Sequence, residues 1–182
     1  NEEQNRLVLY LLDKRNEDDI RYLQKLVVYS KDISKNRSID NQISDLFSLP
    51  SDYFDFINVS GVFSRGECSA SDFNLWEAKN ENVNELLADE FNKPSYDYRD
   101  AFYTIGEEGI RVYKGDFNVD KLFLSYYRYP NPVDISGYIK SDNSSSTDID
   151  PELDDKLVDI ILNMVEKQFA LNESEYNRYQ ID

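Results

Sequence analysis

The sequence predicts an α+β protein: a helical bundle from N- and C-terminal helices with an inserted antiparallel β-meander. Two observations predict this class. Apolar side chains recur at helical spacing toward both ends of the chain, in residues 7–27 and 150–172. Between them, residues 49–132 are rich in aromatic and β-branched side chains that alternate with polar ones, which is typical of strands. We expect the whole chain, residues 1–182, to form a single domain.

Residues 1–48 are predicted to be helical, because no glycine or proline interrupts them. The first helix would carry four apolar residues on one face: Leu7, Val8, Leu11 and Leu12. Asn16 is a suitable N-cap for a second helix. The apolar stripe of that second helix would consist of Ile20, Leu23 and Val27. The polar residues 34–42 predict a loop, and residues 43–47 predict a short amphipathic turn.

Residues 53–63 predict the first strand of the central region. Their alternation slips between Phe56 and Ile57, which indicates a β-bulge. A short helix is expected near residues 83–91, because apolar side chains share one face there and Pro94 then ends it.

Two further strands, residues 102–105 and 110–113, flank a turn that contains Gly106 and Gly109. Glycines at such a turn allow positive φ angles, so these residues predict a hairpin. Residues 121–129 alternate in the same way and predict a third strand. We expect these strands to form the antiparallel meander, which two prolines then end.

Residues 133–149 predict a polar loop, and Asp150 followed by Pro151 predicts the start of the C-terminal helix, residues 150–172. Six residues would form its core stripe: Leu153, Leu157, Ile160, Ile161, Met164 and Val165. Three more widen the apolar face: Val158, Leu162 and Phe169. A face this broad should pack on more than one neighbour. Residues 173–182 are predicted to be a polar tail.

The composition excludes several kinds of catalytic and metal site. There is no histidine and one cysteine, Cys68, so disulfide formation within the chain, Ser–His or Cys–His catalysis and a structural zinc site are excluded. The aspartates between Asp142 and Asp155 lack the spacing of an EF-hand calcium loop. Paired carboxylates can hydrolyse glycosides, but no pair is distinguished among the 36 acidic residues. We therefore expect no enzymatic activity, no cofactor and no bound metal.

The charge and hydropathy pattern restricts the partners. A formal net charge of −16 argues against gripping nucleic acid or anionic membranes, which both attract Lys and Arg. The longest apolar run, residues 7–12, is too short to span a bilayer, and the start of the sequence has no secretory pattern. A single cysteine fits a reducing compartment such as a bacterial cytoplasm.

The tyrosine-rich segment at residues 125–130 is the most distinctive in the chain. Tyrosine favours strands, so one face of this segment is expected to pack in the sheet. The other face combines Tyr with Arg, which is typical of protein interfaces. The candidate subunit-interface residues, from this strand and from the tail, are Tyr127, Arg128, Tyr129, Tyr176, Tyr179 and Ile181. An alternative is a bacterial binding module whose aromatic sheet faces a small ligand or a protein.

The order of segments resembles the head-to-tail connector (ring or adaptor) proteins of tailed bacteriophages, especially the crAss-like phages. The matching segments are residues 2–6, 49–54, 85–95, 110–115, 122–130, 150–153 and 176–180. The most specific part is a strand that ends Tyr-Arg-Tyr-Pro at Pro130, then a loop, then an acidic helix start.

This resemblance implies a non-enzymatic virion protein that needs no cofactor. It implies a ring of about twelve copies that binds the portal and neighbouring ring or tail proteins. DNA would pass through the ring's channel without specific binding. The expected location is the neck or tail of the virion, and the host cytoplasm during assembly.

Overall fold

The structure, a computed structural model, describes residues 1–14, 20–39, 43–68, 70–140 and 143–179. Where the sequence predicts one domain, contacts group the chain into two compact units. The β unit comprises Val28–Arg128, and the helical unit comprises Asn1–Val27 together with Tyr129–Asp182.

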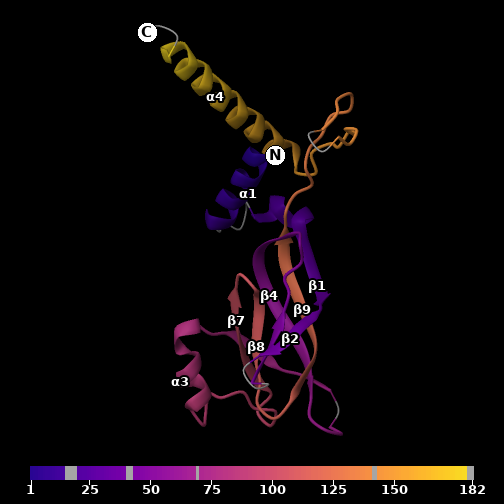
Figure 1. The fold of residues 1–182 in the computed structure, drawn as a ribbon, viewed down its shortest axis with the longest axis vertical. Coiled ribbons are helices and arrows are strands. Elements are labelled where there is room, and N and C mark those ends of the chain that lie inside the picture. The colour runs from indigo at the N-terminus through magenta and orange to yellow at the C-terminus, as the bar shows by residue number, and fades with distance from the viewer. Residues whose placement is uncertain (15–19, 40–42, 69, 141–142, 180–182) are drawn as a thin grey trace. The chain divides into compact units, whose positions relative to one another are not determined.

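The β unit contains nine strands in two sheets among its described residues (Figure 1). The first sheet has the order β1 (Val27–Ile33), β9 (Asn118–Arg128), β4 (Tyr53–Ser64) and β5 (Ser71–Asp72). The second has the order β2 (Lys35–Ile39), β3 (Ser44–Phe47), β8 (Gly109–Tyr113), β7 (Asp100–Gly106) and β6 (Asn74–Glu77). The chain passes from the first sheet to the second at Ser34, between β1 and β2.

The two sheets pack on one shared apolar core. Its buried residues come from β4 and β9 of one sheet and from β3, β7 and β8 of the other. Phe63 of β4 is fully buried, stacks on Phe73 at 4.4 Å between ring centroids and meets Phe117 edge-on at 5.6 Å. Alternation along the strands explains this arrangement, because every second residue of β9 from Leu122 to Tyr126 is buried in the core.

A helix covers the other side of the second sheet. The helix α3 (Val83–Ala88), preceded by the 3₁₀ turn η2 (Asn80–Asn82), packs on a smaller apolar cluster. In that cluster the ring of Phe102 stacks on Tyr113 at 4.9 Å and contacts Trp76 at 5.3 Å. The second sheet is therefore apolar on both faces.

A buried ion group lies where β2, β3 and β8 meet. The Asp45 side chain is fully buried, and its Oδ2 lies 2.8 Å from Lys35 Nζ and 2.9 Å from Lys114 Nζ. The Ser38 hydroxyl donates to Asp45 Oδ1 at 2.7 Å. Burial by itself would raise the pKa of Asp45, but the bonds from Lys35, Ser38 and Lys114 bring that pKa below its usual value. The carboxylate is therefore held in its charged form.

The helical unit is assembled from both ends of the sequence. Its elements are α1 (Glu2–Lys14), the 3₁₀ helix η1 (Arg21–Leu26) and the long helix α4 (Asp155–Tyr179), yellow in Figure 1. α1 packs against α4 through its apolar face. Asn1 exchanges two hydrogen bonds with Val133, at 3.2 and 2.7 Å, and Asn131 N donates to Glu152 Oε2 at 3.0 Å. These bonds tie the start of the chain to the segment that leads into α4.

The predicted helical bundle is wrong, because the structure is mostly β. Within residues 1–48 only α1 is an α-helix among the described residues. The predicted second helix is replaced by the 3₁₀ helix η1 and β1, and its predicted cap Asn16 lies outside the described residues. β2 and β3 replace the predicted loop and turn. Two causes explain this. Val27, Val28 and Ile33 are β-branched and favour a strand over a helix. In β3 the buried Asp45 breaks the apolar alternation by which a strand is recognised.

The predicted meander is also wrong in one pairing. The hairpin of β7 and β8 forms as expected, with Gly106 opposite Gly109. β9, however, pairs with β4 in the other sheet instead of continuing from β8. The lengths explain the choice: β9 has 11 residues and β4 has 12, whereas β8 has only 5. The bulge expected near Phe56 is confirmed by a register shift between Phe56 and Asn58.

The C-terminal helix begins later and ends later than predicted. It starts at Asp155, because Asp154 takes the capping role expected of Asp150: its Oδ1 accepts from the amide of Lys156 at 3.2 Å. The helix runs to Tyr179, so most of the predicted tail is helical. Leu153 and Leu157 are buried as predicted, but Ile160, Leu162 and Phe169 of the expected apolar face are exposed.

The Asp45 group gives the first prediction. Asp45→Asn should destabilise the protein by about 3–5 kcal/mol at pH 7, because it leaves the buried Lys114 ammonium without its counter-charge. Urea unfolding measures this. Since the pKa of Asp45 is lowered on folding, its contribution is present above about pH 3.9 and is lost as pH falls further, so the two proteins should converge at low pH.

Arg37→Ala is the matched control, because it breaks an exposed pair with Glu108 (3.2 Å) and should cost at most about 1 kcal/mol. Equal effects of the two substitutions would contradict the role given to Asp45.

A second prediction compares two leucines of α4. Leu157 is 3% exposed and Leu162 is 55% exposed. Leu157→Ala should cost about 2–5 kcal/mol of unfolding free energy, because it leaves a cavity in the helical unit. Leu162→Ala should change that free energy by less than about 0.5 kcal/mol. Thermal and urea unfolding of both variants checks this, and a large loss from Leu162→Ala would show that the exposed face is packed.

Candidate interaction surface

The predicted interface residues at the end of β9 belong to two different units. Tyr127 and Arg128 are half-buried in the β unit, where Tyr127 pairs with Asp55 and Arg128 pairs with Tyr53. Burial, followed by the proximity of Tyr29 and Asp55, raises the pKa of Tyr127. Tyr129 opens the second part of the helical unit and is 46% exposed. This segment is therefore mainly sheet structure.

Beside it, Tyr126 forms a polar group that sequence reasoning missed. Lys31 Nζ donates to the Tyr126 hydroxyl at 3.0 Å, and that hydroxyl donates to Asp52 Oδ1 at 2.9 Å. Lys31 also lies 3.6 Å from Asp52. The hydrogen bond to Tyr126 raises the pKa of Lys31. This group joins β1 and the start of β4 to β9, so we assign it to the architecture of the sheet.

The predicted tail residues fall at the limit of the described chain. Tyr176 and Tyr179 lie within the bounds of α4, but their side chains are outside the described part. Ile181 lies outside the described residues altogether.

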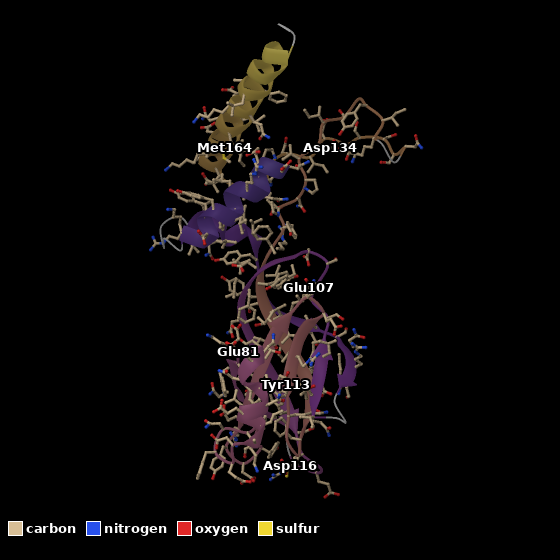
Figure 2. The ribbon with its side chains drawn as sticks, turned by 60° about the vertical axis from the view of Figure 1, so that its left-hand side comes forward. Glu81, Glu107, Tyr113, Asp116, Asp134 and Met164 are labelled. Carbon is tan, nitrogen blue, oxygen red and sulfur yellow. The ribbon has the colours of Figure 1, made fainter. Side chains whose placement is uncertain are left out.

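An apolar ridge on α4 is the strongest candidate surface. Four residues at successive spacings of four, three and four share one side of the helix: Val158, Leu162, Val165 and Phe169. We call them the α4 seam. Leu162 and Phe169 are 55% and 68% exposed, and Val158 and Val165 are half-buried. In both views α4 extends past α1 toward its C-terminal end (Figures 1 and 2). The helix is therefore longer than the partner that the chain itself supplies.

A hollow opens where the seam meets the start of α1. It has a volume of about 240 Å³. Its lining combines Val165 and Phe169 of the seam with Gln168 and the first residues of the chain, Asn1, Glu2 and Glu3. Arg6 forms ion pairs with both glutamates, at 2.8 Å from Glu3 and 3.6 Å from Glu2, and the Glu2 side chain is 80% exposed. The hollow thus has apolar walls and an acidic edge.

Acidic residues also run along one flank of the seam. Asp155, Asp159 and Glu166 are exposed and lie on the same side of α4, because their spacings of four and seven repeat the helical period. Within the described part of the chain, none of these carboxylates has a cation within ion-pair distance. The seam is therefore an apolar strip beside an uncompensated acidic strip.

The segment before α4, residues 133–149, carries further exposed apolar side chains, and hydrogen bonds to Asp134 hold its backbone in place. Asp134, labelled in Figure 2, accepts from Lys140 Nζ at 2.7 Å, the Tyr138 hydroxyl at 2.6 Å and the amides of Ile135 and Thr147 at 3.1 and 3.3 Å. The bonds from Lys140 and Tyr138 hold the pKa of Asp134 well below its usual range. Ile135 and Ile139 are 70% and 74% exposed. The polar loop predicted here is closed by Asp134 together with Asp148, which accepts two hydrogen bonds from Ser136, and by backbone bonds between Asp134 and Ile149.

Comparison with known proteins assigns no function to this chain, so a functional assignment depends on the geometry described above. No family model matches the sequence, and no curated protein matches it. Among the described residues, no group of three or more acidic or cysteine side chains is placed to hold a metal ion. None of the described helices is both long and apolar enough to cross a membrane.

A prediction concerns the loop that Asp134 closes. Asp134→Asn should speed hydrogen exchange at the Ile135 and Thr147 amides, because a neutral amide accepts these bonds more weakly than a carboxylate. Since folding lowers the pKa of Asp134, the protection should be present above about pH 3.9 and fade as pH falls.

Asp150→Asn serves as the control, because the Asp150 side chain is exposed near α4 and makes no hydrogen bond or ion pair within the described part of the chain. Unchanged exchange in Asp134→Asn would refute this account of the loop.

Proposed function

We propose that this chain is a non-enzymatic structural subunit of the head-to-tail connector of a tailed bacteriophage. It forms a ring on the portal that seals and extends the DNA channel between head and tail. The observation that carries this proposal is the α4 seam, a continuous apolar ridge that α1 covers only in part. The order of segments that resembles connector proteins supplies the assembly to which the ridge would belong.

Two features support an assembly role. Contiguous exposed apolar surface marks protein interfaces in soluble proteins, and here it lies on a regular helix. The loop 133–149 adds exposed apolar side chains that a local hydrogen-bond network holds in place. Pre-organised contacts bind with a smaller loss of conformational entropy.

The negative net charge of the protomer supports a channel wall along which DNA slides. A protomer with a formal net charge of −16 repels the phosphate backbone, so DNA would pass without sticking. The same charge makes identical copies repel one another, so ring formation needs buried contacts between copies or on the portal to offset the repulsion.

The rival function, a module whose aromatic sheet binds a small ligand, gains less support. Such a site needs aromatic side chains that line an open pocket. Phe63 and Tyr126, on the two strands with the richest aromatic content, are fully buried in the core. A hollow of about 310 Å³ near the β7–β8 hairpin is lined mainly by polar and glycine residues, including Thr104, Glu107 and Arg111.

The test is assembly with the portal encoded in the same genome. Co-expression should yield a complex in which several copies of this chain sit on one portal ring, measured by native mass spectrometry and seen as an added layer by electron microscopy. The chain should also be found in purified virions by peptide mass spectrometry. A chain that stays monomeric beside the portal and is absent from virions would overturn the proposal.

A further inference from the structure

We propose that the α4 seam binds an amphipathic helix of a different protein, one whose apolar stripe is flanked by lysine or arginine. This inference deepens the proposed function, on which it rests for its setting, by stating the chemistry of the partner. It concerns the outer side of α4, the side marked by Leu162 and Phe169.

The shape of the surface favours a helix as the occupant. The spacing of four, three and four between Val158, Leu162, Val165 and Phe169 is the spacing by which one helix meets another in a coiled coil. The hollow at Val165 and Phe169 gives a place for one large side chain of the incoming helix.

The charge beside the seam selects a basic partner. Asp155, Asp159 and Glu166 occupy the flank that would face the edge of an incoming helix. In helix pairs, residues at such flanking positions form ion pairs that decide which partner is accepted. At the mouth of the hollow Glu2 is exposed too, but it already lies 3.6 Å from Arg6, so the selection rests on the three carboxylates of α4. Lysine or arginine beside the partner's apolar stripe would pair with these groups.

The same charges argue against a second copy of this chain at the seam. A second α4 would bring its own Asp155, Asp159 and Glu166 to the contact, and like charges at these positions repel. The lysines of α4 that are described, Lys156 and Lys167, fall on another side of the helix. Lys156 Nζ also lies over the Tyr22 ring of the same unit at 5.7 Å. The seam therefore fits a contact between this protein and a different one, such as the portal or a neighbouring ring protein.

The test uses the purified full chain and two synthetic helices of about three heptads with the same leucine stripe, one flanked by lysine and one by glutamate. Fluorescence anisotropy at physiological salt measures binding of each labelled peptide. The lysine-flanked peptide should bind at least about tenfold more tightly than the glutamate-flanked one. The double substitution Asp159→Lys/Glu166→Lys should reverse this preference.

Two controls distinguish binding at the α4 seam from nonspecific attraction of a basic peptide to an acidic protein. Glu67→Lys/Glu81→Lys makes the same charge change on exposed residues of the β unit and should leave the preference intact. Leu162→Ala/Phe169→Ala should abolish binding of the lysine-flanked peptide, whereas Phe91→Ala, which removes a 93% exposed ring of the β unit, should not. Circular dichroism confirms that each variant is folded.

Every outcome bears on the inference. Absence of binding, equal binding of both peptides, or binding that survives Leu162→Ala/Phe169→Ala would each overturn it. Self-association of the chain that Leu162→Ala abolishes, detected by sedimentation, would also overturn it in favour of a second copy. The test needs no portal, so its failure leaves the ring proposal standing, and failure of the ring assay leaves this binding result intact.

Discussion

The antiparallel pairing of β4 with β9 is the constraint on which the β unit depends. It joins segments more than fifty residues apart and sets which side chains of both strands enter the core. The register also requires close approach at Gly61, where an added Cβ would lie 2.9 Å from the Phe63 ring and 3.2 Å from Leu122. Once these two strands are paired, β1 lies on the outer side of β9, and the hairpin of β7 and β8 packs on the opposite side of the core.

Local signals predicted four strands of the middle region, missed β5 and β6, and predicted the pairing of the strands poorly. Alternation identified β4, β7, β8 and β9, because half-buried strands repeat with a period of two. The partner of β9 depends on which distant strand matches its length and on how Phe117 enters the core, and a local pattern shows neither. The N-terminal strands were missed for another reason. β2 is a polar edge strand, and β3 buries Asp45 by pairing it with Lys35 of β2 and with Lys114, which follows β8, so neither strand shows an apolar alternation.

The candidate surface was predicted in part. The broad apolar face of the C-terminal helix was visible in the sequence, as was the inference that it needs more than one neighbour. The predicted core stripe was wrong at Ile160, which is 44% exposed. Leu162 and Phe169 of the wider apolar face are exposed as well, because α1 has 13 residues against 25 in α4. A helix pattern gives the width of an apolar face but not how much of it the same chain can cover. Tyr127 and Arg128, chosen from composition, serve mainly in strand pairing.

The position of β9 has a mechanical consequence. This strand ends at Arg128, and the next residue begins the second part of the helical unit, so tension on the helical unit is transmitted through the backbone directly into β9. β9 is an inner strand with β1 on one side and β4 on the other. β1 also adjoins the helical unit, at Val27, so tension from that unit enters β1 and β9 together. The hydrogen-bond ladder between β9 and β4 then carries the load on β9 into the rest of its sheet. Because the rate of rupture under load is governed by the rate of unfolding, this pairing bears directly on how the β unit resists force.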